Sequence, residues 1–315
     1  DIFLGTGGSS LGGKTLNSIK QNQYKKKNKP NIYFVENVDS EQIKALLEHT
    51  KAKETFFIVI SKSGETIETL CQFFFVKNFF KLSKKKLSER FLIITENKKS
   101  TLKLIQEELD CLYLEHNKKI GGRYSIFSVV GMLPAQLSDL DTSKIIQGGL
   151  NVLKKMISTK DIKKFFPATA SLHNYKLINK GIRQSILMPY SDSLINLSMW
   201  YRQLWGESIG KEGLGSTPIN ALGTVDQHSQ LQLYLDGPKD KFITIINLKN
   251  KRKTFILDCS IEKNVFCDSL HKKTMNDLIE AEKEATFQTL KKKDIPLRVI
   301  ELESKNEEVI GELLM

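Results

Sequence analysis

The sequence predicts an α/β protein with two units, each a parallel sheet flanked by helices, and three observations support this fold class. Short apolar runs alternate with helical patterns from the first residue onward, which is typical of parallel strands joined by crossover helices. The run over residues 55–60 is suited to a strand that is buried on both faces. The length of 315 residues, of which 40% are hydrophobic, suggests about two domains.

The first half of the chain alternates strand and helix without interruption. Strands are expected at residues 2–4, 31–36, 55–60, 91–95 and 111–114. Helices are expected at about 10–22, after Asp39, at 65–82 and around 102–108. Asp39 suits the start of its helix because Gln42 stands three residues later, in the capping-box position. We expect these elements to form a first domain over residues 1–134.

A helical stretch over residues 142–158 then breaks the pattern and is expected to bridge two domains. The alternation resumes with strands at 185–188, 242–248 and 297–301, and with helices at 168–179, 194–204 and 275–291. The bridge and these elements make a second domain over residues 135–315. Short-period repeats and low-complexity linkers are absent from the sequence.

The charge and the cysteines exclude several classes of function. Lysine and arginine outnumber aspartate and glutamate by 48 to 36, but the lysines form short runs without interleaved aromatics, which is unlike a nucleic-acid surface. Such a basic balance does attract small phosphorylated anions. No apolar run approaches the ~18 residues of a membrane span. The four cysteines form neither a CxxC pair nor a cysteine–histidine cluster, so we expect reduced thiols in a cytoplasmic protein and no metal site.

Two loops follow strands of the first domain, where open parallel sheets bind ligands. The loop Gly5-Thr6-Gly7-Gly8-Ser9-Ser10-Leu11-Gly12-Gly13 fits neither the dinucleotide fingerprint nor a P-loop, and it is either a tight turn or a backbone cradle for an anion. The loop Ser61-Lys62-Ser63-Gly64-Glu65-Thr66 combines three hydroxyls and a lysine with a helix N-terminus, which favours phosphate binding. The alternative is that Ser63 merely caps the helix.

Three further residues are candidates for catalysis. Arg123 follows Gly121 and Gly122, and a closely held arginine can stabilise an oxyanion or clamp a phosphate, although an ordinary turn has the same composition. Glu207 ends a Trp-rich apolar helix, where a carboxylate becomes a stronger base, and His228 is suited to proton transfer to oxygen. From spacing alone, these two could equally be a helix-end carboxylate and a loop histidine.

Five motifs occur in a fixed order along the whole chain. They are Gly5-Thr6-Gly7-Gly8-Ser9-Ser10-Leu11-Gly12, Ser61-Lys62-Ser63-Gly64-Glu65-Thr66, Gly121-Gly122-Arg123-Tyr124-Ser125, Glu207-Ser208-Ile209-Gly210-Lys211 and Asp226-Gln227-His228-Ser229. This series resembles the phosphoglucose isomerase family, in particular its shorter bacterial form. The resemblance implies two sugar-isomerase (SIS) domains of flavodoxin-like topology. It also implies interconversion of glucose 6-phosphate and fructose 6-phosphate through an enediolate, without metal or cofactor.

The resemblance also implies a role for each matching residue. Glu207 would move the proton between carbons 2 and 1, Arg123 would stabilise the enediolate, and His228 would assist ring opening from the neighbouring subunit of a homodimer. The residues expected to bind phosphate or sugar are Gly8, Ser9, Ser61, Lys62, Ser63, Thr66 and Gln203. The family's N-terminal segment and its C-terminal lysine helix have no counterpart here, so we expect a fragment.

Two other functions are compatible with the sequence. A non-catalytic phosphosugar-binding protein would keep the serine loops but would not need Glu207, Arg123 and His228 together. An isomerase that also accepts mannose 6-phosphate would differ only in the fit around carbon 2. Nucleic-acid binding through the lysine runs is disfavoured, and a steep dependence on salt would reveal it.

Overall fold

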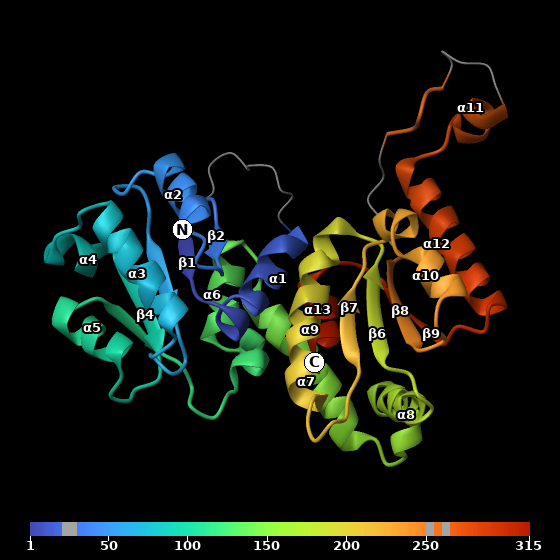
Figure 1. Cartoon of the computed structure of the whole chain (residues 1–315), viewed down its shortest axis with the longest axis horizontal. Coiled ribbons are helices and arrows are strands. Elements are labelled where there is room, and N and C mark those ends of the chain that lie inside the picture. Colours follow the sequence, from blue (N-terminus) through green and yellow to red (C-terminus); the bar gives the residue numbers. More distant parts are fainter. Residues whose placement is uncertain (21–29, 250–254, 260–264) are drawn as a thin grey trace. The chain divides into compact units, whose positions relative to one another are not determined.

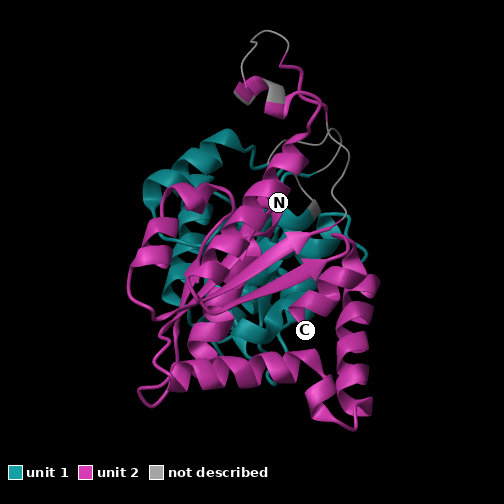
Figure 2. Ribbon diagram, turned by 90° about the vertical axis from the view of Figure 1, so that its right-hand side faces the viewer, with its two compact units in different colours: residues 1–142 teal, residues 143–315 magenta. Residues whose placement is uncertain are grey.

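The computed structural model describes residues 1–20, 30–249, 255–259 and 265–315 (Figure 1). The chain divides into two compact units, Asp1–Thr142 and Ser143–Met315 (Figure 2). The boundary expected between residues 134 and 135 lies inside helix α6 (Val129–Leu137). This helix belongs to the first unit, where Ser138 just beyond it donates a hydrogen bond of 2.7 Å to Asn17 of helix α1 (Leu11–Lys20).

The first unit is built on a parallel sheet of five strands in the order β2-β1-β3-β4-β5. The strands are β1 (Ile2–Leu4), β2 (Tyr33–Val35), β3 (Phe57–Ile60), β4 (Phe91–Thr95) and β5 (Leu112–Glu115). This order is the flavodoxin-like one, so the predicted fold class is confirmed. Every residue of β3 is buried, as the apolar run over 55–60 predicts for a central strand.

Both faces of the first sheet are covered by helices, because alternate residues of each strand point to opposite sides. Phe57 and Val59 pack on one face with α2, α3, α4 and α5, whereas Ile58 and Ile60 pack on the other face with α6. The helices are α2 (Ser40–His49), α3 (Ile67–Phe79), α4 (Lys84–Arg90) and α5 (Thr101–Leu109). Asp39 caps α2 as expected, accepting hydrogen bonds from the backbone of Glu41 and Gln42.

The second unit repeats this winding in a parallel sheet of four strands, in the order β7-β6-β8-β9. The strands are β6 (Gln184–Pro189), β7 (Thr217–Asn220), β8 (Lys241–Leu248) and β9 (Leu297–Leu302). The helices are α7 (Thr142–Ser158), α8 (Phe166–Asn179), α9 (Ile195–Ile209), α10 (Leu231–Asp236), α11 (Val265–Leu270), α12 (Met275–Lys292) and α13 (Glu307–Leu314).

The two faces of this second sheet carry different elements. Ile186 and Ile243 pack with α10 and α12 on one face. On the other face, Ser185 is hydrogen-bonded to Tyr201 of α9, and Phe242 lines a small cavity together with residues of α8 and α9. Figure 1 shows α9 on the opposite side of β6 and β8 from α10 and α12.

Several elements were not predicted, and their surroundings explain why. Helix α4 begins with the lysine run at 84–86, which is unfavourable at a helix N-terminus, but its Leu87 is buried in the core. Strand β7 contains a proline and lies at a sheet edge, where the missing N–H is tolerated. The lysine run at 25–27 and the expected end of the first helix at 21–22 lie outside the described residues.

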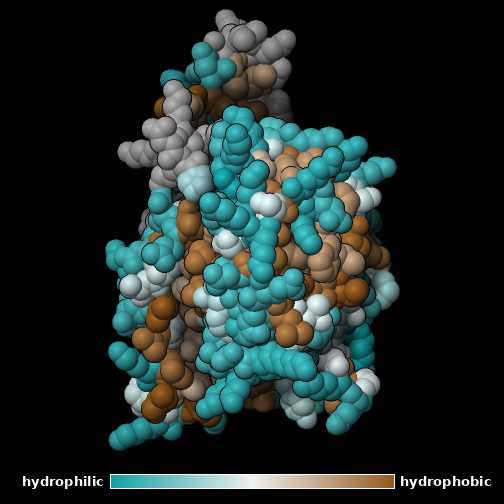
Figure 3. Space-filling model, turned by 90° about the vertical axis from the view of Figure 1, so that its left-hand side faces the viewer, coloured by the Kyte–Doolittle hydropathy of each residue, from teal (hydrophilic) through white to brown (hydrophobic). Residues whose placement is uncertain are grey.

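Among the described residues, no helix is both long and apolar enough to cross a bilayer. Figure 3 shows one face on which hydrophilic side chains predominate and hydrophobic ones are interspersed.

Candidate active site

The loop after β3 gathers the hydroxyls that the sequence assigned to phosphate binding. The Oγ of Ser61 lies 2.8 Å from the Oγ1 of Thr66 and 3.5 Å from the Oγ of Ser63. The N–H groups of Gly64 and Glu65 donate to Ser61 and Ser63, respectively, at 3.1 Å each. Helix α3 has Thr66 as its N-cap residue, so Ser63 is not the helix cap. The three hydroxyls therefore stand together at the N-terminus of a helix, a favourable place for an anion.

Contacts with helix α5 brace this loop. The carboxylate of Glu65 accepts hydrogen bonds of 2.7 Å from both the N–H and the hydroxyl of Thr101. These bonds hold the pKa of Glu65 below its ordinary value. Gly64 has a φ of +73°, and a Cβ there would lie 2.1 Å from the Oγ of Ser100, so only glycine fits this position.

The loop after β1 packs against the Gly-Gly-Arg motif. A Cβ at Gly8 would lie 2.3 Å from the carbonyl carbon of Gly122, and the hydroxyl of Ser125 donates to the carbonyl of Gly8 at 2.9 Å. Arg123 lies in a short 3₁₀ helix over Gly122–Phe127, with its guanidinium 4.6 Å from the ring centroid of Tyr124. Strands β1 and β3 are neighbours, and the chain leaves β1 toward β2 on one side and β3 toward β4 on the other. The loops after β1 and β3 therefore lie at the point where the strand order reverses, which is where such sheets bind ligands.

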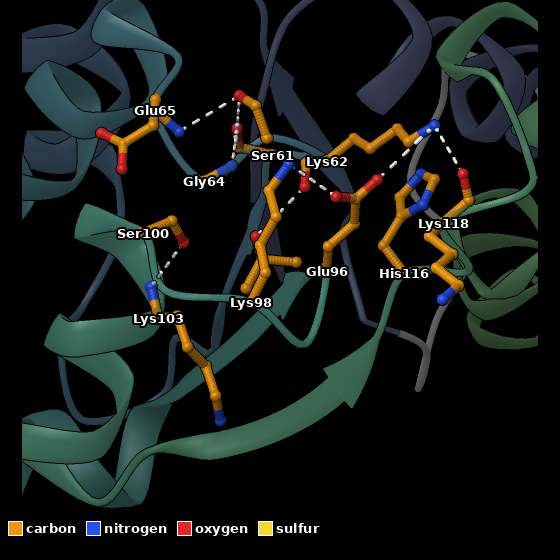
Figure 4. A network of polar contacts seen from close by, with 12 residues as sticks. Ser61, Lys62, Gly64, Glu65, Glu96, Lys98, Ser100, Lys103, His116 and Lys118 are labelled. Carbon is orange, nitrogen blue, oxygen red and sulfur yellow. Dashed lines mark hydrogen bonds and ion pairs between the residues drawn. The ribbon is translucent and has the colours of Figure 1, made fainter.

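Lys62 differs from the other residues of its loop. Its ammonium lies 3.2 Å from the carbonyl oxygen of Lys118 and 3.6 Å from Oε1 of Glu96. Figure 4 shows the side chain extending away from Ser61 and toward these two partners. The structure thus brings the hydroxyls of the loop together but places the lysine of the same motif elsewhere.

Glu207 and Gln203 lie one turn apart on helix α9. The Nε2 of Gln203 donates to Oε1 of Glu207 at 2.9 Å, which orients the carboxylate. Helix α9 continues to Ile209, five residues beyond the predicted end at 204, so Glu207 stands within the helix. The apolar surroundings expected for Glu207 are not found within this unit, because the residue is exposed. Trp205 instead donates to Ser216 at 3.0 Å, and its ring stacks on Tyr201.

His228 ends a 3₁₀ helix over Val225–His228 that is held from two sides. Asp226 accepts hydrogen bonds from the N–H of Leu222 and the hydroxyl of Ser229, each at 2.6 Å. Burial acts to raise the pKa of Asp226, but these hydrogen bonds outweigh it and the pKa is lowered. Gln227 donates to the side chain of Thr286 on α12 at 2.5 Å.

Glu207 and His228 are therefore anchored on opposite faces of the second sheet. Helix α9 packs on the face of Ser185, whereas Gln227 ties the His228 loop to α12 on the other face. Each side chain is exposed. Both expected acid–base residues thus lie in the second unit, Glu207 on helix α9 and His228 at the end of the 3₁₀ helix over Val225–His228.

A family model described as phosphoglucose isomerase matches residues 2–292. The chain belongs to the phosphoglucose isomerase family. A probable glucose-6-phosphate isomerase of Methanococcus maripaludis is 34% identical, with the alignment covering 100% of this chain and 70% of that protein. The glucose-6-phosphate isomerase of Rubrobacter xylanophilus is 31% identical, with 99% and 74% covered.

Solved structures share the fold of this chain. The chain is similar to a hypothetical protein, TT0462, from Thermus thermophilus, with a TM-score of 0.89 and 26% identity over 99% of this chain and 74% of that chain. A glucose-6-phosphate isomerase from Chlamydia trachomatis shares the fold, with a TM-score of 0.81 and 22% identity over 99% of this chain and 62% of that chain.

Three residues beside the loop after β3 were not predicted to belong to the site. They are Glu96, Lys98 and His116. The carboxylate of Glu96 lies between the ammonium groups of Lys62 and Lys98, and His116 lies beside Lys62 (Figure 4). Glu96 directly follows the last residue of β4, and His116 directly follows β5. Their positions at the carboxyl ends of parallel strands are the signal that could have identified them.

Proposed function

We propose that this chain catalyses the reversible isomerisation of glucose 6-phosphate and fructose 6-phosphate through an enediolate. The observation that carries the proposal is the family match over residues 2–292, which includes both the hydroxyl loop and Glu207. We also propose a cytoplasmic location, to which the free thiols of Cys71, Cys111 and Cys259 are suited.

The first unit would bind the phosphate and stabilise charge. Ser61, Ser63 and Thr66 supply hydroxyl donors beside the N–H groups of α3, and Gly8 and Ser9 supply a close backbone approach from the other loop. Lys62 would add its charge. Arg123 would stabilise the oxyanion of the enediolate, because its guanidinium is always charged and carries several donors.

The second unit would move the protons. Glu207 would remove the proton from carbon 2 of the open-chain sugar and return it to carbon 1, and Gln203 would orient that carboxylate and contact sugar hydroxyls. His228 would assist ring opening. This sequence of steps uses side chains alone and draws on neither a metal nor a cofactor.

We further propose a homodimer in which His228 serves the site of the neighbouring subunit. Supporting this, Glu207 and His228 are exposed and are anchored on opposite faces of the second sheet. A histidine on a rigid exposed loop is available to a second copy of the chain.

A coupled assay on the full-length protein tests the proposal, with fructose 6-phosphate supplied and glucose 6-phosphate detected. Glu207→Gln should lower kcat by roughly 10²- to 10⁴-fold while phosphosugar binding persists. Glu212→Gln, a change at another exposed carboxylate near the end of α9, is the matched control and should retain activity.

The outcomes separate the candidate functions. Binding without turnover in the wild type would identify a phosphosugar-binding protein instead of an enzyme. Equal turnover in wild type and Glu207→Gln would keep the isomerase but reject Glu207 as the base. Mannose 6-phosphate, supplied in the same assay, would show whether specificity is broader.

A further inference from the structure

The lysine of the phosphate loop is paired with a carboxylate from the next strand. Lys62 follows β3 by two residues, and Glu96 follows the neighbouring strand β4 directly. The N–H of Glu96 donates to the carbonyl of Lys62 at 3.2 Å, and the two side chains approach to 3.6 Å. The Lys62 side chain is therefore held back along the strand ends rather than over the loop hydroxyls (Figure 4).

Glu96 is shared between two lysines, and the sharing is unequal. Its Oε2 lies 2.7 Å from the ammonium of Lys98, a hydrogen-bonding distance, whereas the 3.6 Å contact with Lys62 is longer than a hydrogen bond. The carboxylate side chain is only 12% exposed, and that of Lys62 is 31% exposed. The hydrogen bond with Lys98, which contributes most, and the charge of Lys62 hold the pKa of Glu96 below its ordinary value.

His116 closes the cluster without adding a charge. It is 2% exposed, and its Nδ1 lies 3.2 Å from the carbonyl of Asn117. Burial and the charge of Lys62 lower its pKa, and they outweigh the hydrogen bond to Asn117 and the charge of Glu96, which act to raise it. The imidazole is therefore mostly neutral at pH 7. The Glu96 carboxylate therefore faces the ammonium groups of Lys62 and Lys98, and Lys98 also interacts electrostatically with Glu65.

We propose that Glu96 is a positioning residue that, together with the Lys118 carbonyl, draws the Lys62 ammonium away from the hydroxyl loop, and that Lys98 keeps this hold weak enough for a phosphate monoester to draw Lys62 back. The inference rests on the proposed function, since it requires that Ser61, Ser63 and Thr66 bind the substrate phosphate. A phosphate dianion is a stronger partner for Lys62 than a carboxylate at 3.6 Å. When Lys62 leaves, Glu96 retains Lys98, so no buried carboxylate is left unpaired.

The proposal predicts that substitutions of Glu96 and Lys98 shift KM in opposite directions. Glu96→Gln removes the charge that holds Lys62 and leaves only the hydrogen bond to the Lys118 carbonyl, so it should lower KM for fructose 6-phosphate about two- to fivefold, with kcat unchanged. Lys98→Met leaves Lys62 as the partner of Glu96 and should raise KM by a similar factor. In the double variant, KM should match that of Glu96→Gln, because Lys98 acts through Glu96.

Charge-matched controls distinguish this role from the effect of changing the net charge near the site. Glu115→Gln and Lys99→Met remove the same charges from exposed residues next to His116 and Lys98, and each should leave KM within a factor of about 1.5. The inference is wrong if the controls shift KM as far as the paired variants do, or if Glu96→Gln and Lys98→Met shift KM in the same direction.

Calorimetric binding of fructose 6-phosphate to the same variants makes the two proposals separable. If the wild type binds the sugar phosphate but does not turn it over, the isomerase proposal fails, while the dissociation constants of the variants still test Glu96. If the wild type is active and the dissociation constants do not change, the role of Glu96 fails and the isomerase remains.

Discussion

Gly8 lies against the backbone of Gly122, and Gly8→Ala is the perturbation whose effect the structure defines most sharply. The added Cβ would lie 2.3 Å from the carbonyl carbon of Gly122 and 2.4 Å from its oxygen. Since carbon atoms pack at about 3.5–4.0 Å, the two segments would have to separate by roughly 1 Å. Overpacking of this kind costs about 1–3 kcal/mol of stability.

The separation should impair activity more than stability. Ser9 follows Gly8 and Arg123 follows Gly122. Both of these proposed site residues would therefore move with the segments that are pushed apart. A misplacement of about 1 Å can lower a rate by about 100-fold. We therefore expect kcat/KM for fructose 6-phosphate to fall by roughly 10- to 100-fold in the coupled assay, with a cooperative urea transition retained.

Gly122→Ala is the matched control, because a Cβ added at Gly122 would not clash with Gly8. A Cβ at Gly122 would lie 3.9 Å from the Cα of Gly8, an ordinary van der Waals distance. This variant should stay within a few-fold of wild-type kcat/KM and within about 1 kcal/mol of wild-type stability. Equal losses in the two variants, or wild-type activity in Gly8→Ala, would refute the packing argument.

Two further predictions concern stability. Burial holds the pKa of His116 below its ordinary 6.5, so the unfolded chain takes up a proton that the folded chain does not as the pH falls below 6.5. His116→Gln should reduce the decline in the free energy of unfolding as the pH falls, as measured by urea titration at a series of pH values. If the free energy of unfolding depends on pH as steeply in the variant as in the wild type, His116 is not the cause of the decline. Trp205→Phe removes a hydrogen bond of 3.0 Å to Ser216 and should cost about 1 kcal/mol, as should Ser216→Ala. A double variant that loses the sum of both effects would show that the two residues do not interact.

Much of the fold was predictable because it is encoded over short stretches of chain. The strand at 91–95 and the helix at 142–158 have the predicted bounds, since an apolar run and a 3.6-residue periodicity are both local signals. Strand β7 and helix α4 escaped prediction because they depend on distant partners, the edge of β6 and the core around Leu87. Packing overrides local preference in such elements.

The two α/β units and the motifs that identify the family could be predicted from the amino-acid sequence, because periodicity and loop composition are properties of neighbouring residues. Which of those residues contact one another depends on the tertiary structure. The contact of Gly8 with Gly122, the pairing of Lys62 with Glu96 and the attachment of Gln227 to α12 each join distant segments. These contacts depend on the strand order and on where the carboxyl ends of parallel strands converge. Both are set by the crossover connections between strands and cannot be predicted from a local sequence pattern.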